Sequence, residues 1–288
     1  MKAAAILVKS FTQDQAAGNP AGIVLDADKL TDQQMQHIAT ELGFAETMFV
    51  LPSSKADFRL RFFAPNHEVD LCGHGTIASF HVLLEQGRLD LDGHEAKDFT
   101  QETRAGLLGV TVHGDGRVVM TQNNPTFTEI EEDKANIARL LGIAQNDISS
   151  ESPIQIVSTG TPKLLIPLRT LPSLRSVKPE LKGIKDYCRT TPARGFYPFT
   201  TESPIAGTDF FARQFNPLAD ENEDPVTGVA AGALGCYAKK YHVYDKPTFV
   251  VAQGYDLGMG GNMFVDVSDG VKVGGYAMTY GRKELEVV

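Results

Sequence analysis

The distribution of apolar residues predicts short strands over most of the chain. Phe58, Leu60 and Phe62 alternate with two arginines, and this period of two is typical of a strand with one buried face. Three more segments are rich in β-branched and aromatic residues and end at turn formers: 3–9, 21–25 and 47–51. A hairpin turn is predicted at 113–116, where His-Gly-Asp-Gly lies between two apolar runs.

Four segments have helical spacing, and they are of two kinds. The first begins with a capping box, Thr31 with Gln34, and stops at Gly43, while 133–141 has the same amphipathic character. The segments 77–84 and 230–237 are instead apolar on nearly every side. A helix without a polar face must be surrounded by protein, so we expect the last two helices to be buried.

Each predicted buried helix follows a glycine junction, and the two junctions belong to a longer internal match. Three anchors recur in the same order in both halves: Gly18-Asn19-Pro20 with Gly160-Thr161-Pro162, Phe63-Ala64-Pro65 with Phe215-Asn216-Pro217, and Gly73 with Gly228. The offset between matched anchors grows from 142 to 152 to 155 residues, which indicates two modest insertions in the second half. We interpret the match as an internal duplication; the alternative is a chance recurrence of common Gly-Pro turns.

The duplication predicts an α+β protein of two pseudo-repeated lobes. Each lobe is expected to be a curved, mostly antiparallel and barrel-like sheet around its own central helix. We expect an N-terminal lobe over 1–121, a C-terminal lobe over 122–275, and a terminal strand over 276–288, with a return to the first lobe as one arrangement. The two helix N-termini are equivalent points that can face each other across a cleft. Their unpaired N–H groups and partial positive charge would suit a small anion such as a carboxylate.

Composition narrows the class of protein further. The chain has 288 residues, 42% of them hydrophobic and 22% charged, which fits a soluble globular protein of more than one core. Its net charge of −9 disfavours nucleic-acid partners, and no apolar run approaches the roughly 20 residues that span a bilayer. The three cysteines, Cys72, Cys188 and Cys236, are widely spaced and odd in number. We therefore expect free thiols and a cytoplasmic protein with no membrane partner.

Several common chemistries find no support in the sequence. There is no Cys-x-x-Cys pair, and the seven histidines lack metal-ligand spacing. A Walker-type loop and a dinucleotide fingerprint are also absent, and the glycine-rich stretch 254–261 reads as a hairpin between strands. We expect no metal and no organic cofactor.

Four motifs together carry a family resemblance. They are Gly18-Asn19-Pro20-Ala21-Gly22, Phe44-Ala45-Glu46-Thr47, Glu68-Val69-Asp70-Leu71-Cys72-Gly73-His74-Gly75-Thr76 and Glu223-Asp224-Pro225-Val226-Thr227-Gly228. In this order and spacing they resemble the PhzF-like isomerases, which are named for a phenazine biosynthesis enzyme and share the diaminopimelate epimerase fold. The resemblance spans about residues 1–240. It implies a cofactor-independent isomerase that shifts a proton within a small carboxylate substrate, and a homodimer.

The resemblance also assigns roles to individual residues. It implies that Glu46 is the catalytic acid/base, and burial in the apolar stretch around it would raise a carboxyl pKa toward neutrality. His74 is implied to bind substrate or relay protons, and Asp224 to hydrogen-bond the substrate. Taken alone, these three could be a solvent-facing glutamate, a packed histidine and a turn-forming Asp-Pro. We expect the N–H groups after Gly73 and Gly228 to hold the substrate carboxylate.

Cys72 supports alternative functions. Residues 72–76 also resemble proline racemases and hydroxyproline epimerases, which use two cysteines on opposite faces of the substrate. The duplication would put the second cysteine at Thr227, and Cys236 lies about two helical turns too far along, so a two-cysteine racemase is disfavoured. An epimerase or dehydratase that uses Cys72 alone and a non-catalytic small-anion binder stay open as alternatives. Cys72 and Val229 are expected to line the site; Val229 stands where the phenazine enzyme carries serine, which argues against the phenazine substrate itself.

Overall fold

The chain forms two compact units in the computed structural model, which describes residues 2–131, 133–219 and 221–286. Unit 1 contains the chain up to Thr121 and again from Gly274 onwards, and unit 2 contains Gln122–Val273. Each unit is a sheet packed around one apolar helix, which is the predicted fold class. Among the described residues, no helix combines the length and the apolar character needed to cross a membrane.

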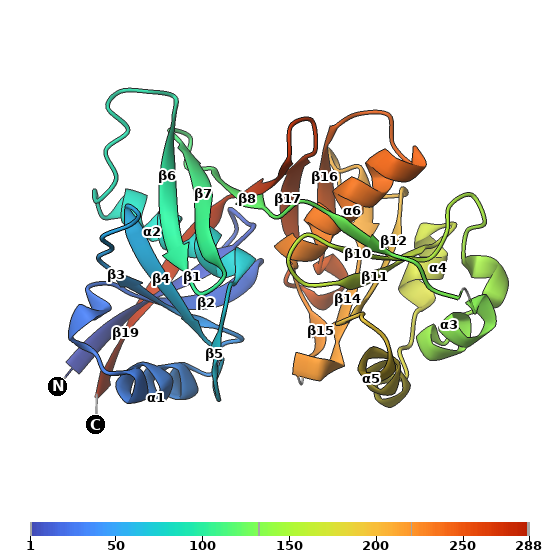
Figure 1. The fold of residues 1–288 in the computed structure, drawn as a ribbon, viewed down its shortest axis with the longest axis horizontal. Helices are drawn as coiled ribbons and strands as arrows, with labels where there is room; N and C mark the ends of the chain where they lie inside the picture. The colour runs from blue at the N-terminus through green and yellow to red at the C-terminus, as the bar shows by residue number, and fades with distance from the viewer. Residues whose placement is uncertain (1, 132, 220, 287–288) are drawn as a thin grey trace. The chain divides into compact units, whose positions relative to one another are not determined.

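Unit 1 begins and ends with paired strands. Its elements are β1 (Lys2–Ser10), β2 (Asn19–Val24), η1 (Ala27–Lys29), α1 (Asp32–Leu42), β3 (Thr47–Leu51), β4 (Phe58–Phe63), β5 (Glu68–Val69), α2 (Gly73–Glu85), β6 (Ala96–Thr103), β7 (Gly106–His113), β8 (Val118–Gln122) and β19 (Ala277–Glu286). The last strand, β19, runs antiparallel to β1 along its whole length, and the two lie side by side (Figure 1). The C-terminal strand therefore belongs to the sheet of unit 1.

The predicted local signals of unit 1 are confirmed. Thr31 caps α1 through a bond from the Gln34 N–H at 3.3 Å, and Gln34 Oε1 accepts the Thr31 N–H at 3.1 Å. Gly43 ends the helix with φ of 68°, a backbone conformation that glycine adopts without strain. The turn at 113–116 joins β7 to the antiparallel β8.

Helix α2 is buried because it crosses between two parallel strands of the sheet that surrounds it. Strands β4 and β6 pair in parallel, and α2 lies between them in the chain. Nine of its thirteen residues are buried, in agreement with the prediction from its apolar sequence. A Cβ at Gly75 would lie 2.6 Å from the Met48 sulfur, so glycine allows α2 to pack this closely on β3.

Unit 2 repeats this plan with extra helices. Its elements are β9 (Thr126–Thr128), α3 (Lys134–Leu141), η2 (Gln145–Asp147), β10 (Gln155–Ser158), β11 (Lys163–Pro167), α4 (Leu171–Ser176), α5 (Leu181–Thr190), β12 (Phe196–Thr200), β13 (Phe210–Ala212), β14 (Gln214–Asn216), η3 (Pro217–Ala219), β15 (Glu221–Asp224), α6 (Gly228–Tyr241), β16 (Thr248–Gln253), η4 (Tyr255–Leu257), β17 (Gly261–Asp266) and β18 (Val271–Gly275). Helix α6 lies between the parallel strands β13 and β16, as α2 lies between β4 and β6. Ten of its fourteen residues are buried, as predicted.

Helices α4 and α5 were not predicted from the sequence. Within α5, Leu181, Ile184 and Cys188 lie at helical spacing on one face, so the sequence did carry a periodic signal for this helix. Gly183 weakens that signal, yet it has a packing role, since a Cβ there would lie 2.5 Å from Leu140 of α3. The two helices lie in the crossover between the parallel strands β11 and β12, which β2 and β3 match in unit 1.

A mostly buried ion pair anchors the hairpin that leads into α2. Arg61 donates from Nε and Nη2 to the two carboxylate oxygens of Glu68, both at 2.8 Å. The side chains are only 12% and 15% exposed, and the guanidinium lies 5.0 Å from the ring centre of Phe63. Such bidentate geometry fixes the position of β5 relative to β4.

Unit 2 has the same arrangement at the matching place. Arg213 donates from Nε and Nη2 to Glu223, again at 2.8 Å for both bonds, and stacks 4.9 Å from Phe215. This pair joins the segment before β14 to β15, which leads into α6. The internal match read from Gly-Pro anchors thus extends to side-chain geometry, which supports a duplication over chance recurrence.

Candidate active site

The first glycine junction brings three predicted site residues together in unit 1. Cys72 is the N-cap of α2, Gly73 is its first residue, and His74 lies in its first turn. Glu46 directly precedes β3 and reaches the same place, with its Oε2 3.5 Å from His74 Nε2. The Cys72 sulfur lies 3.3 Å from His74 Nδ1. A carboxylate, an imidazole and a thiol therefore converge at the N-terminus of a buried helix.

Burial divides these groups into accessible and enclosed ones. The Glu46 side chain is 24% exposed, whereas His74 is 9% exposed. Glu46 is therefore neither the fully buried carboxylate nor the solvent-facing one that the sequence left open. Burial lowers the pKa of His74 to about 4, so the imidazole is neutral at physiological pH.

The Cys72 thiol lies at the N-terminus of α2. Its sulfur accepts the N–H of Gly75 at 3.3 Å, which satisfies one of the free donors at the start of α2. The partial positive charge of a helix N-terminus stabilises a thiolate. The backbone around the thiol is also held, because Thr76 Oγ1 donates to the Cys72 carbonyl at 3.0 Å and Ser10 Oγ to the His74 carbonyl at 2.7 Å.

The same three side chains could hold a metal ion. One ligand atom from each of Glu46, Cys72 and His74 lies within 4.8 Å of the others. Thiolate, imidazole and carboxylate are the ligand types that zinc accepts. Sequence spacing did not indicate this group, because Glu46 is 26 residues away from Cys72 in the chain. The sequence expectation of no metal stays a prediction.

Neutral burial of His74 makes stability depend on pH. Between its unfolded pKa of 6.5 and its folded value of about 4, the unfolded chain binds a proton that the folded protein does not. Stability should therefore fall as pH falls, by about 2 kcal/mol between pH 7 and pH 5 from this group. Urea unfolding at both pH values measures the loss, and His74→Gln should remove it. An unchanged pH dependence in His74→Gln would contradict this assignment.

The second junction places three predicted residues in unit 2. Asp224 ends β15, Gly228 begins α6, and the half-buried Val229 follows it. Thr227 is the N-cap of α6, and its hydroxyl donates to Asp224 Oδ2 at 2.5 Å. The structure thus groups Asp224 with the junction, while the facing of the two junctions across one cleft stays a prediction from the sequence.

Two buried residues that the sequence did not indicate hold the first turn of α6. Gln122 donates from Nε2 to the Gly228 carbonyl at 3.1 Å, and Thr159 donates to Gln122 Oε1 at 2.6 Å. Thr159 also lies 3.2 Å from the Val229 carbonyl. Thr159 precedes the matched Gly160-Thr161-Pro162 anchor, which was the available signal in the sequence.

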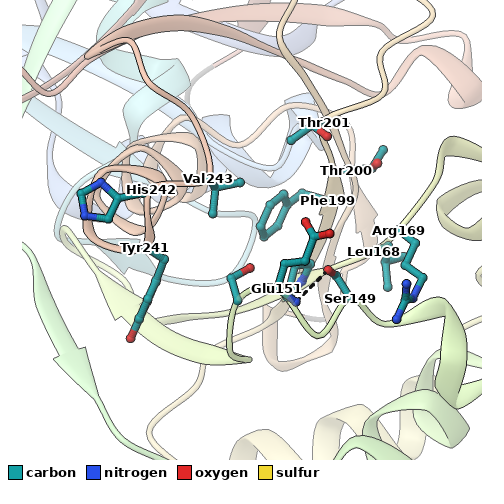
Figure 2. A pocket seen from close by; sticks show the side chains of 12 residues that line it. Ser149, Glu151, Leu168, Arg169, Phe199, Thr200, Thr201, Tyr241, His242 and Val243 are labelled. Carbon is teal, nitrogen blue, oxygen red and sulfur yellow. Dashed lines mark hydrogen bonds between the residues drawn. The ribbon is translucent and has the colours of Figure 1, made fainter.

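A polar cavity of about 300 Å³ lies elsewhere in unit 2 (Figure 2). Its lining includes Leu168 and Thr200 at the ends of β11 and β12, and His242 at the end of α6. No residue of the second junction lines it. Because α6 has fourteen residues, about 20 Å of helix separates this cavity from Gly228.

Comparison with known proteins identifies the family of the chain. A family model described as phenazine biosynthesis-like protein matches residues 8–282. The chain belongs to this family. The uncharacterized isomerase YfhB of Bacillus subtilis is 36% identical to it, over 93% of this chain and 92% of that protein. The uncharacterized isomerase YddE of Escherichia coli K12 is 35% identical, over 93% and 91%. The family resemblance predicted from four motifs is confirmed, and relatives named as isomerases support an isomerase.

Solved structures extend the comparison to the fold. A PhzF-family phenazine biosynthesis protein from Bacillus anthracis covers 100% of both chains, with a TM-score of 0.90 and 32% identity. A hydroxyproline epimerase from Agrobacterium vitis, solved with bound trans-4-hydroxy-L-proline, covers 99% of this chain and 91% of its own, with a TM-score of 0.65 and 13% identity. That likeness shows a shared fold. The phenazine biosynthesis-like family and the epimerases therefore have the architecture predicted from the sequence.

Proposed function

We propose that this member of the phenazine biosynthesis-like family catalyses a proton shift within a small carboxylate substrate, with Glu46 as acid and base. The observation that carries the proposal is the convergence of Glu46, His74 and Cys72 at the start of α2. Of the Glu46–His74 pair, the glutamate is the more exposed and therefore the one that a substrate can reach. An isomerase has to return the proton that it removes, and a single carboxylate can do both.

The proposed reaction balances without an external proton donor. Glu46 takes a proton from an activated C–H bond, and the electron pair left behind spreads into the conjugated system of the substrate. The protonated Glu46 then delivers the proton to another carbon of that system. Backbone N–H groups after Gly73 and Gly228 are proposed to bind the carboxylate, and Asp224 to bind a polar group of the substrate. The reaction as proposed requires no metal or organic cofactor.

The experiment that tests the proposal is solvent exchange. The protein is incubated in heavy water with a panel of small carboxylates, including amino and hydroxy acids, and deuterium in each is measured by mass spectrometry. A base that returns a proton incorporates solvent deuterium whenever it exchanges with water between removal and return. Incorporation by the wild type that disappears in Glu46→Gln supports the proposal, and incorporation by both at equal rates refutes it.

A second candidate function rests on Cys72. Its sulfur accepts a backbone N–H at a helix N-terminus, the environment that activates thiolates. An epimerase or dehydratase that uses this single thiol would lose activity in Cys72→Ser and keep it in Glu46→Gln. The reverse pattern favours the glutamate mechanism. A small-anion binder would give no deuterium incorporation with any variant.

We also propose that the protein is a homodimer, on the family resemblance. We propose that it is cytoplasmic, because its three cysteines are free thiols. Sedimentation equilibrium of the purified protein measures the mass in solution. A mass of one chain, 31.3 kDa, at micromolar concentration would overturn the dimer.

A further inference from the structure

Thr227 stands at a helix N-cap but does not cap the helix. The hydroxyl oxygens of Thr31 and Thr170, at the N-caps of α1 and α4, accept a backbone N–H from the first turn at 3.3 and 3.2 Å. Thr227 makes no such bond and instead donates its proton to Asp224 Oδ2 at 2.5 Å. Threonine normally stabilises a helix by capping it, so this hydroxyl has another role.

The direction of the hydrogen bonds around Thr227 is fixed by its neighbour Gln253. Gln253 Oε1 accepts the backbone N–H of Thr227 at 3.3 Å and the hydroxyl of Tyr197 at 3.0 Å. A backbone N–H can only donate, so the amide oxygen must face it and the amide nitrogen must face the other way. Gln253 Nε2 then donates to Thr227 Oγ1 at 3.1 Å and to the Asp224 carbonyl at 2.8 Å. The proton of Thr227 is left for Asp224.

This network lies in the interior of unit 2. Tyr197 is fully buried, Gln253 is 1% exposed, and Thr227 is 8% exposed. Burial and the nearby charge of Asp224 raise the pKa of Tyr197 well above its usual value, so its hydroxyl keeps its proton at any physiological pH. The chain of bonds from Tyr197 and Gln253 through Thr227 therefore ends on Asp224 as a hydrogen-bond acceptor.

The corresponding place in unit 1 is built differently. Cys72 occupies the N-cap that matches Thr227, and its sulfur does accept an N–H from its helix. A buried glutamine, Gln101, lies on β6 after α2, as Gln253 lies on β16 after α6. Gln101 contacts Thr76 at 3.2 Å. The two junctions share a plan, but the first presents a thiol and the second holds a carboxylate.

We propose that Thr227 and Gln253 are positioning residues that hold the Asp224 carboxylate in one orientation as a hydrogen-bond acceptor. The proposal rests on the proposed function, in which Asp224 binds a polar group of the substrate. Because the Thr227 hydroxyl donates to Oδ2, the orientation of the carboxylate is set before a substrate group approaches. The absence of cysteine at position 227 is then a specialisation of the second junction.

The test is a double-mutant cycle between Thr227 and Asp224. The probe is the amino or hydroxy acid of the panel that the wild type labels fastest in heavy water. Thr227→Val keeps the shape and removes the hydroxyl, and kcat/KM for this probe should fall about ten- to hundredfold. Thr227→Ser restores the hydroxyl and should stay within about threefold of the wild type. In an Asp224→Ala background, Thr227→Val should change the rate by less than about threefold, because Thr227 acts through that carboxylate.

Controls separate positioning from structural damage and from failure of the function itself. Thr170→Val removes a true capping hydroxyl in the same unit and should leave kcat/KM unchanged. An undiminished ten- to hundredfold loss from Thr227→Val in the Asp224→Ala background, or no rescue by Thr227→Ser, would overturn the positioning role. If Glu46→Gln is fully active, the proposed mechanism fails, yet the cycle still reports on Thr227.

A further measurement needs no substrate. The Gln253 side-chain amide protons should exchange with solvent at least about tenfold faster in Thr227→Val than in the wild type, because one of their two acceptors is lost. Equal exchange rates would contradict the network.

Discussion

Glu46→Gln should lower turnover by about 100- to 10,000-fold, the range that general acid–base catalysis contributes. The amide has nearly the shape of the carboxylate and can keep the contact with His74 Nε2, which lies 3.5 Å from Oε2. It cannot accept a proton from carbon at neutral pH. His74 cannot take over as an acid, because burial keeps its pKa near 4 and its ring neutral. Turnover is measured as deuterium incorporation into the fastest substrate of the panel.

A matched control addresses nonspecific effects of the substitution. Glu41 lies on α1 of the same unit, is 46% exposed, and contacts His37, so Glu41→Gln makes the same chemical change at another glutamate beside a histidine. Turnover of Glu41→Gln should equal that of the wild type. A Glu46→Gln protein with wild-type turnover would remove Glu46 from the reaction and favour Cys72, whose sulfur lies 3.3 Å from the same histidine.

The second large effect is expected on stability, at the ion pair that anchors the hairpin before α2. Arg61→Met should lower the free energy of unfolding by about 3 kcal/mol, because it leaves Glu68 largely buried without its bidentate partner. This loss of stability is at the lower end of the range for broken buried ion pairs, because Arg104 Nη1 still donates to Glu68 Oε2 at 3.3 Å. Methionine keeps most of the apolar stem, so the change isolates the charge and its hydrogen bonds. Urea denaturation at pH 7 measures the difference.

Arg104→Met provides the matched control for this pair. Arg104 contacts the same carboxylate but is 53% exposed, so its removal should cost less than about 1 kcal/mol. Acid provides a second signature. Hydrogen bonds from Arg61, and then its charge, hold the pKa of Glu68 below the usual 4.5, so this stabilisation exists above pH 4.5 and is lost as pH falls through the folded value. The gap between wild type and Arg61→Met should narrow below pH 4.5. Equal costs for Arg61→Met and Arg104→Met would contradict the role of burial.

Local elements were predictable where short-range signals decide them. The helix from Thr31 to Gly43 has its cap, its stop and its apolar face within a few residues of one another. The buried helices were equally clear, because only enclosure by protein tolerates an apolar surface all round. Helix α4 was not predicted because its six residues are too few to show a helical period. Helix α5 was not predicted although Leu181, Ile184 and Cys188 lie at helical spacing, so in its case the signal was present in the sequence.

The sequence alone determined the duplication, the two glycine junctions and the family to which the chain belongs. Those features are written in residue order, so motifs in the right sequence and spacing identify them. The tertiary structure decided which side chains meet. Glu46 and His74 are separated by a strand pair and a hairpin, and Gln253 lies 26 residues after Thr227, so neither contact follows from spacing. Thr227 shows the difference most clearly. The sequence shows only that threonine stands at the position where a two-cysteine racemase would carry its second cysteine. In the fold, the Gln253 amide donates to the Thr227 hydroxyl oxygen, and the hydroxyl donates to Asp224 instead of capping the helix. Hydrogen-bond direction depends on all partners at once, and the chain brings those partners together only when it folds.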